Sequence, residues 1–196
     1  GNVSLDGTHI KANASIDQNV GYQRAVEIRD QLRLDIDELL AQAESADAVE
    51  EDNQKLPENI ARREKLASKM ERAIEELEAR ARERQEKADT KYEAKTAERR
   101  EKEKKTGKKC TGREPKRSEK KAEDSGEQCN LSDPDARIMR KNKRAGFTQS
   151  YNAQAAVDAD GCQLIVGQHV SQSASDYAEL ENGVASIPGP LIGCWR

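Results

Sequence analysis

Basic side chains gather between Lys91 and Lys121, and among the residues able to do chemistry they point most directly to a binding partner. The segment holds 14 Lys or Arg against 6 Glu, an excess of 8 positive charges in a chain whose net charge is −3. Such an excess attracts a polyanion, so nucleic acid is the first partner that we consider. A solvated linker is the alternative, since basic runs are also frequent in linkers. The residues expected to contact DNA weakly are Lys102, Lys104, Lys105, Lys108, Lys109, Arg113, Lys116 and Arg117.

Cysteine and histidine residues do not form a metal-binding pattern. The two histidines are isolated, and no CxxC pair or histidine pair has the spacing of zinc ligands. We therefore expect thiols in a reducing compartment, with the cytoplasm as the predicted location. No stretch approaches the roughly 20 apolar residues of a membrane span, and no signal-peptide pattern opens the chain. The cysteines are Cys110, Cys129, Cys162 and Cys194.

Asp6 is the acidic residue with the most informative surroundings. Residues 2–10, NVSLDGTHI, alternate apolar and polar side chains on both sides of the Asp6-Gly7 step. This alternation predicts a short strand with a bend or bulge at that step. Taken alone, however, the Asp-Gly pair favours a turn-forming role for Asp6.

The elements that would position these residues are mostly helical. Only 34% of the residues are hydrophobic and 36% are charged, which argues against a single large core. Apolar residues spaced three or four apart predict a helix from about Tyr22 to Glu44. A second amphipathic helix is expected from Pro57 to soon after Lys105, joined to the first by the acidic segment 46–55. The predicted stripes are Ala25, Ile28, Leu32, Ile36, Leu39 and Ala43, then Ile60, Ala67, Met70, Ile74, Leu77 and Ala81.

Strand-forming residues return in the last third of the chain. Segments 147–157 and 163–170 predict a β-hairpin, with Asp158-Ala-Asp-Gly161 as the turn and Gly161 able to take positive φ. The apolar run 164–166 predicts that the second strand lies inside a sheet. Ser175 or Asp176 is the expected cap of a following helix.

Two separated blocks carry a resemblance to a known family. LDGTHIKANAS, residues 5–15, resembles the segment around the first catalytic aspartate of insertion-sequence DDE transposases. GFTQSYNAQAAVDADGCQLIVGQHV, residues 146–170, resembles the second and third sheet strands of the same family. The intervening helices and the NLSDPDARIM segment, residues 130–139, occur where such transposases carry an insertion.

The resemblance implies a fold, a reaction and a metal. It implies a ribonuclease-H-like core in which three carboxylates hold two Mg²⁺ ions for DNA cleavage and strand transfer. Asp6 matches the first carboxylate, and hard oxygen ligands suit Mg²⁺. The neighbouring KANAS residues, 11–15, therefore favour the catalytic interpretation of Asp6 over a turn.

The sequence also departs from the family. The second aspartate is expected on a later strand in an Asp-Ala-Gly-Tyr context, and neither it nor the third acidic residue has a counterpart here. Asp158 and Asp160 fall in the predicted turn and Asp176 at a predicted helix start, so none of the three replaces it. Because the chain starts with Gly1 inside an apolar pattern, we interpret it as an internal piece of a longer protein that is inactive alone.

The fold class that we predict is mixed α/β, a partial ribonuclease-H-like core interrupted by a long helical hairpin or coiled-coil insertion. The expected partner is DNA at transposon ends, without a membrane or a small-molecule substrate. A coiled-coil homodimer is the alternative to an intramolecular hairpin, and a non-catalytic coiled-coil or DNA-binding protein is the alternative function. The expected segments are 1–18 (first strand), 19–106 (hairpin), 107–130 (basic disordered linker), 131–187 (β-hairpin and helix of the core) and 188–196 (tail).

Overall fold

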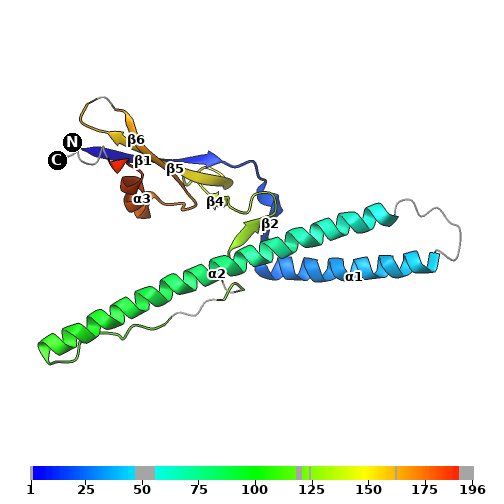
Figure 1. The fold of residues 1–196 in the computed structure, drawn as a ribbon, viewed down its shortest axis with the longest axis horizontal. Coiled ribbons are helices and arrows are strands. Elements are labelled where there is room, and N and C mark those ends of the chain that lie inside the picture. The colour runs from blue at the N-terminus through cyan, green and yellow to red at the C-terminus, as the bar shows by residue number, and fades with distance from the viewer. Residues whose placement is uncertain (1, 47–55, 118–120, 124, 162, 190–196) are drawn as a thin grey trace. The chain divides into compact units, whose positions relative to one another are not determined.

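The computed structural model describes residues 2–46, 56–117, 121–123, 125–161 and 163–189 (Figure 1). The chain contains both α-helices and β-strands, as predicted for a mixed α/β class. It divides into two compact units: unit 1 is Gly1–Asn19 with Cys129–Arg196, and unit 2 is Val20–Gln128. Most of the predicted acidic connection 46–55, the tail from residue 190, Cys162 and Cys194 fall outside the described residues.

Unit 2 is built on two helices, α1 (Tyr22–Ala46) and α2 (Leu56–Thr106). Both predicted helices are confirmed, with boundaries that differ from the prediction by one or two residues. The stripe predicted on α2 is buried from Ala67 to Ala81, and Ala25 and Leu32 are buried on α1. Apolar residues at helical spacing therefore pack the two helices against each other, since burial of that face supplies most of a helix's stability.

Polar contacts between α1 and α2 fix how the two helices pair. The Tyr22 hydroxyl donates to Glu78 Oε1 over 3.0 Å. Near the middle of α1, Arg33 forms an ion pair of 2.6 Å with Glu71. Tyr22 precedes Arg33 in α1, whereas Glu78 follows Glu71 in α2, so the helices run antiparallel (Figure 1).

The segment that follows α2 folds back along that helix. The Arg99 guanidinium donates to the carbonyl oxygens of Cys110, Gly112 and Arg113 over 2.9–3.3 Å. Further along, Arg117 donates to both carboxylate oxygens of Asp89 at 2.8 Å. The basic composition of this segment does not predict these contacts, which depend on where the segment meets α2.

Unit 1 contains an antiparallel sheet centred on its longest strand, β5 (Thr148–Asp158). One edge of β5 pairs with β1 (Val3–Lys11) in a continuous register from Val3↔Asp158 to Lys11↔Ser150. The other edge pairs with β4 (Arg137–Met139) at the start of β5 and with β6 (Ile165–Ser171) further on. The predicted β-hairpin is therefore confirmed as β5 and β6. Two short strands, β2 (Asn19–Gly21) and β3 (Gln128–Asn130), pair separately.

Three local features of unit 1 differ from the simplest expectation. No bulge occurs at Asp6-Gly7, because β1 pairs with β5 without a register shift; the shift lies in β6, between the pairs of Ala156 and Val157. Among the described residues of the hairpin connection, Gln163 is left-handed, at φ 54°, whereas Gly161 does not take positive φ. Leu164 and Ile165 are 62% and 65% exposed. The apolar run is therefore not buried, contrary to the prediction that this strand lies inside a sheet.

One face of the sheet is covered by the segment after β6. A 3-10 helix, η2 (Asp176–Ala178), and the short helix α3 (Leu180–Ala185) contact this face. The Ser175 side chain accepts from the Tyr177 N–H, so the predicted cap is present, but it begins the three-residue η2, and α3 starts later without a side-chain cap. Gly183 of α3 is buried against Leu5, and a Cβ there would lie 2.6 Å from the leucine side chain. Within the described ranges, no helix has both the length and the apolar content to cross a membrane.

Candidate functional site

Asp6 lies on the face of the sheet opposite α3. Side chains alternate along β1, so that Ser4, Asp6, Thr8 and Ile10 are exposed while the intervening residues are partly covered. In the strand register Asp6 faces Ala155 of β5, and Ala155 in turn faces Gln168 of β6. The Asp6 carboxylate is thus held by a three-stranded sheet and faces outward.

A shallow depression of about 540 Å³ surrounds this carboxylate. Its walls are largely apolar, and Thr8 and Gln168 add oxygen atoms to the carboxylate of Asp6. Asp6 is the one carboxylate among the described residues that line it. The other lining residues are Gly7, Ile10, Ala153, Gln154, Ala155, Val157, His169 and Val170.

Oxygen ligands of this kind suit a hard divalent cation. A two-metal centre, however, needs several carboxylates, and this depression offers one. Across the described ranges, no group of three His, Cys, Asp or Glu side chains is arranged to hold a metal. The residues present therefore do not by themselves fit the two Mg²⁺ ions that the resemblance implies.

The covered face of the same strands holds a cluster around Asp176. Asn152 Nδ2 donates to Asp176 Oδ1 over 2.7 Å, and Gln154 Nε2 donates to the same oxygen. Both amide residues are buried, at 0% and 4% exposure. These side chains fill the space above Gly7, where a Cβ would lie 2.9 Å from Asp176 Cγ. Asn152 and Gln154 are thus internal hydrogen-bond donors to Asp176.

A second cluster on the covered face is centred on Glu179, a buried carboxylate. His169 Nε2 lies 2.8 Å from Glu179 Oε2, and the Ser171 hydroxyl donates to Oε1 over 2.7 Å. Asn182 adds a third bond of 3.2 Å. The hydrogen bond with His169, followed by that from Ser171, holds the pKa of Glu179 below its ordinary value near 4.5. Since Ser171 donates to Glu179, its hydroxyl is not set up as a nucleophile next to His169.

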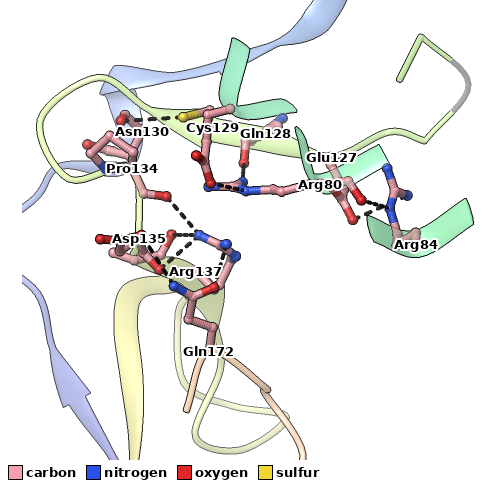
Figure 2. A network of polar contacts seen from close by, with 12 residues as sticks. Arg80, Arg84, Glu127, Gln128, Cys129, Asn130, Pro134, Asp135, Arg137 and Gln172 are labelled. Carbon is pink, nitrogen blue, oxygen red and sulfur yellow. Dashed lines mark hydrogen bonds and ion pairs between the residues drawn. The ribbon is translucent and has the colours of Figure 1, made fainter. Parts of the chain in front are cut away.

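Arg137 and Tyr151 organise the segment before β4 through local bonds. Figure 2 shows the Arg137 guanidinium donating to the carbonyl oxygens of Pro134 and Asp135 and to Gln172 Oε1, at 2.6–2.8 Å. The Tyr151 hydroxyl donates to Asp133 over 2.7 Å. Burial and this hydrogen bond raise the pKa of Tyr151 to about 12. Both residues therefore serve the fold.

All eight basic residues expected to contact DNA are exposed, and all belong to unit 2. Three are engaged by acidic neighbours: Lys102 with Glu98, Lys105 with Glu101 and Arg117 with Asp89. Exposed pairs of this kind are weak, so the lysines stay available to a polyanion. Lys104, Lys108, Lys109, Arg113 and Lys116 form no ion pair within the described part of the chain.

A second basic cluster lies in unit 1 and is much shorter than the basic segment of unit 2. It follows β4 and comprises Arg140, Lys141, Lys143 and Arg144, all exposed. The sequence indicates this cluster by a local lack of acidic residues: residues 136–157 contain five Lys or Arg and no Asp or Glu.

Comparison of the chain with protein-family models, with curated proteins and with solved structures gave no match.

Proposed function

We propose that the chain is part of an insertion-sequence DDE transposase and that Asp6 is its first metal-binding carboxylate. The observation that carries this proposal is the pairing of β1 with β5 and of β5 with β6. The two blocks that resemble the family lie far apart in the sequence, and the proposal requires them to be neighbours in one sheet. Asp6, from the first block, lies near the middle of β1 and pairs with Ala155, from the second block.

The fold that we propose for unit 1 is the beginning of a ribonuclease-H-like core. Its three main strands, β1, β5 and β6, are antiparallel neighbours, with β5 in the centre. Unit 2 is then an insertion between β1 and β5, built on the α1–α2 hairpin. A strand holds a ligand more firmly than a loop does, which supports a catalytic role for a carboxylate on β1.

The orientation of Asp6 supports the proposal further. The Asp176 carboxylate is bonded to Asn152 and Gln154 on the covered face, so it is engaged inside the fold. The Asp6 carboxylate faces the open side, and no hydrogen bond or ion pair is assigned to it within the described residues. An accessible carboxylate on a fixed strand is available to a cation, which could in turn bind a phosphodiester.

One carboxylate does not hold a two-metal site, so we expect the chain by itself to cleave no DNA. The test is to incubate the purified chain with Mg²⁺ or Mn²⁺ and DNA carrying transposon ends, with Asp6→Asn as the paired variant. The expected result is no metal-dependent cleavage by either protein. Robust cleavage that is lost in Asp6→Asn would contradict the expectation, because a single carboxylate would then suffice.

DNA is the partner that we propose for the basic segment after α2. A salt titration of DNA binding tests it, because each phosphate neutralised adds about 0.9 to the slope of log K against log salt. Neutralising Lys104, Lys108 and Lys109 together should lower that slope by about 2 to 3. An unchanged slope would leave this segment as a solvated linker.

A non-catalytic interaction protein is the second candidate. The observation that favours it is the apolar surface left open on the hairpin, where Leu34 is 59% and Leu40 45% exposed. Such residues can pack against a second hairpin, giving a coiled-coil homodimer. Light scattering across a range of concentrations distinguishes the two: a dimer weakened by Leu34→Gln favours this candidate, whereas a monomer counts against it.

A further inference from the structure

The loop between β4 and β5, residues 140–147, concentrates positive charge in unit 1. Four of its first five residues are basic: Arg140, Lys141, Lys143 and Arg144. No acidic residue occurs from 136 to 157, so no sequence neighbour offsets these charges. We call this segment the β4–β5 loop.

No acidic side chain neutralises these four charges within the described residues. All four side chains are exposed. Within the described part of the chain none of them forms an ion pair, whereas the nearby Arg137 is saturated by backbone carbonyls and Gln172 (Figure 2). Four like charges within five residues repel one another, and a polyanion relieves that repulsion.

The β4–β5 loop has a defined turn. Asn142 Oδ1 accepts from the backbone N–H groups of Arg144 and Ala145, at 3.0 and 2.7 Å. The Ala145 N–H also donates to the Asn142 carbonyl oxygen over 3.2 Å. An asparagine that bonds to the backbone two and three residues ahead is a local turn-forming device. The basic side chains are therefore presented on an ordered turn between two paired strands.

An exposed aromatic ring ends the loop. Phe147, the one phenylalanine of the chain, is 56% exposed. The Arg140 guanidinium lies over this ring, 5.1 Å from its centroid. A guanidinium stacked on a ring orients it, and a ring next to cations is the arrangement on which unpaired bases stack while their phosphates are neutralised.

We infer that the β4–β5 loop binds single-stranded DNA, with Lys141, Lys143 and Arg144 on the phosphates and Phe147 stacking on a base. The flat ring distinguishes this ligand from an acidic protein or an anionic membrane, neither of which offers a base to stack. The inference goes beyond the proposed function, because it uses neither Asp6 nor the basic segment of unit 2.

Fluorescence anisotropy of the full chain with a labelled oligothymidylate of about 15 nucleotides tests the phosphate contacts. The loop variant is Lys141→Gln/Lys143→Gln/Arg144→Gln. Its matched control, Arg62→Gln/Lys65→Gln/Lys69→Gln, removes the same charges from exposed positions of α2 that form no ion pair within the described residues. The loop variant should lower the slope of log K against log salt by about 2 relative to the control, at about 0.7 per phosphate.

The stacking contact is tested by Phe147→Leu. Loss of one stacked base should weaken oligothymidylate binding about tenfold and leave duplex binding unchanged. Helix content and thermal midpoint, followed by circular dichroism, verify that each variant is folded. Oligothymidylate binding is measured with EDTA and no divalent cation, so that failure of the catalytic proposal and failure of this one are separable.

Three outcomes would overturn the inference. The first is equal binding by the loop variant and its control. The second is an equal loss for single strand and duplex in Phe147→Leu, since a stacked base would then play no part. The third is a loop variant that loses binding to vesicles of phosphatidylcholine and phosphatidylserine while it keeps its oligothymidylate affinity.

Discussion

Gly7→Ala is the substitution that tests the geometry next to Asp6 most sharply. In a strand this change usually stabilises, by about 0.5 to 1 kcal/mol, because alanine loses less backbone entropy on folding than glycine does. Here the new Cβ would overlap Gln154 Nε2 and Asp176 Oδ1 and would lie 2.9 Å from Asp176 Cγ. Since Gln154 is buried, its amide has little room to withdraw.

The expected cost follows from these contacts. Overpacking of this kind costs about 1 to 3 kcal/mol. If Asp176 withdraws instead, the buried amides of Asn152 and Gln154 lose an acceptor, at about 1 to 3 kcal/mol. After the alanine gain is subtracted, Gly7→Ala should lower the free energy of unfolding of unit 1 by up to about 2.5 kcal/mol.

Hydrogen exchange followed by mass spectrometry measures this, because peptides from β1 and β5 report on unit 1 separately from the helices. Gly146→Ala is the control, since a Cβ there meets nothing within 4 Å. In an Asp176→Ala background, Gly7→Ala should lower the free energy of unfolding by about 1 kcal/mol less than in the parent. This difference measures the energetic coupling between positions 7 and 176. Faster exchange in the control, or slower exchange in Gly7→Ala than in the parent, would refute the packing described around Gly7.

The remaining predictions concern three other contacts. Glu179→Gln should destabilise unit 1 at neutral pH, and the difference should shrink as the pH falls below about 4.5, because a carboxyl with a lowered pKa stabilises only while ionised; urea unfolding at several pH values measures it, and a constant difference would count against it. In an alkaline absorbance titration Tyr151→Phe should differ little from the parent below pH 11, as its pKa is about 12; a lost step near pH 10 would contradict this. Arg99→Ala should speed tryptic cleavage within 107–117, whereas the exposed neighbour Arg100→Ala should not, and equal rates would show that the carbonyl contacts do not hold the segment.

Helices and hairpin strands were predictable because their signals are local. The buried residues of α2 recur at the spacing that places them on one face, and this periodicity is visible without any knowledge of α1. The strands β5 and β6 are connected directly, so the turn residues and the alternating pattern suffice to predict their pairing. The sequence pattern did not predict the backbone conformation of the connection, where Gln163 and not Gly161 is left-handed.

The surroundings of Asp6 were not predictable from local patterns. Gly7 meets Gln154 and Asp176, residues distant in the sequence, and only the register of β1 on β5 brings them together. The Asp6-Gly7 pair therefore predicts a bend when only neighbouring residues are considered. In the structure the strand is regular, and the missing side chain of Gly7 leaves room for Gln154 and Asp176 on the covered face. Leu164 and Ile165 were misassigned for the same reason, as exposure depends on which neighbours cover the strand.

The two faces of the sheet in unit 1 carry polar residues with different surroundings. Glu179, His169 and Ser171 form one internal network, and Asp176, Asn152 and Gln154 form another, both on the covered face. Partnered polar groups of this kind stabilise a unique arrangement of the strands. The open face keeps Asp6 accessible, so the carboxylate that we propose as a metal ligand and the two internal networks lie on opposite sides of the same strands.

Manganese(II) titration of the isotope-labelled chain, followed by nuclear magnetic resonance, tests the role of Asp6 most directly. We predict paramagnetic broadening in the roughly millimolar range, weak because one carboxylate binds alone, and centred on the amides of Asp6, Ala155 and Gln168. Asp6→Asn should abolish it, while Asp176→Asn, which alters a carboxylate on the covered face, should leave it in place. Broadening that persists in Asp6→Asn, or that centres on Asp176, would contradict a metal-binding role for Asp6.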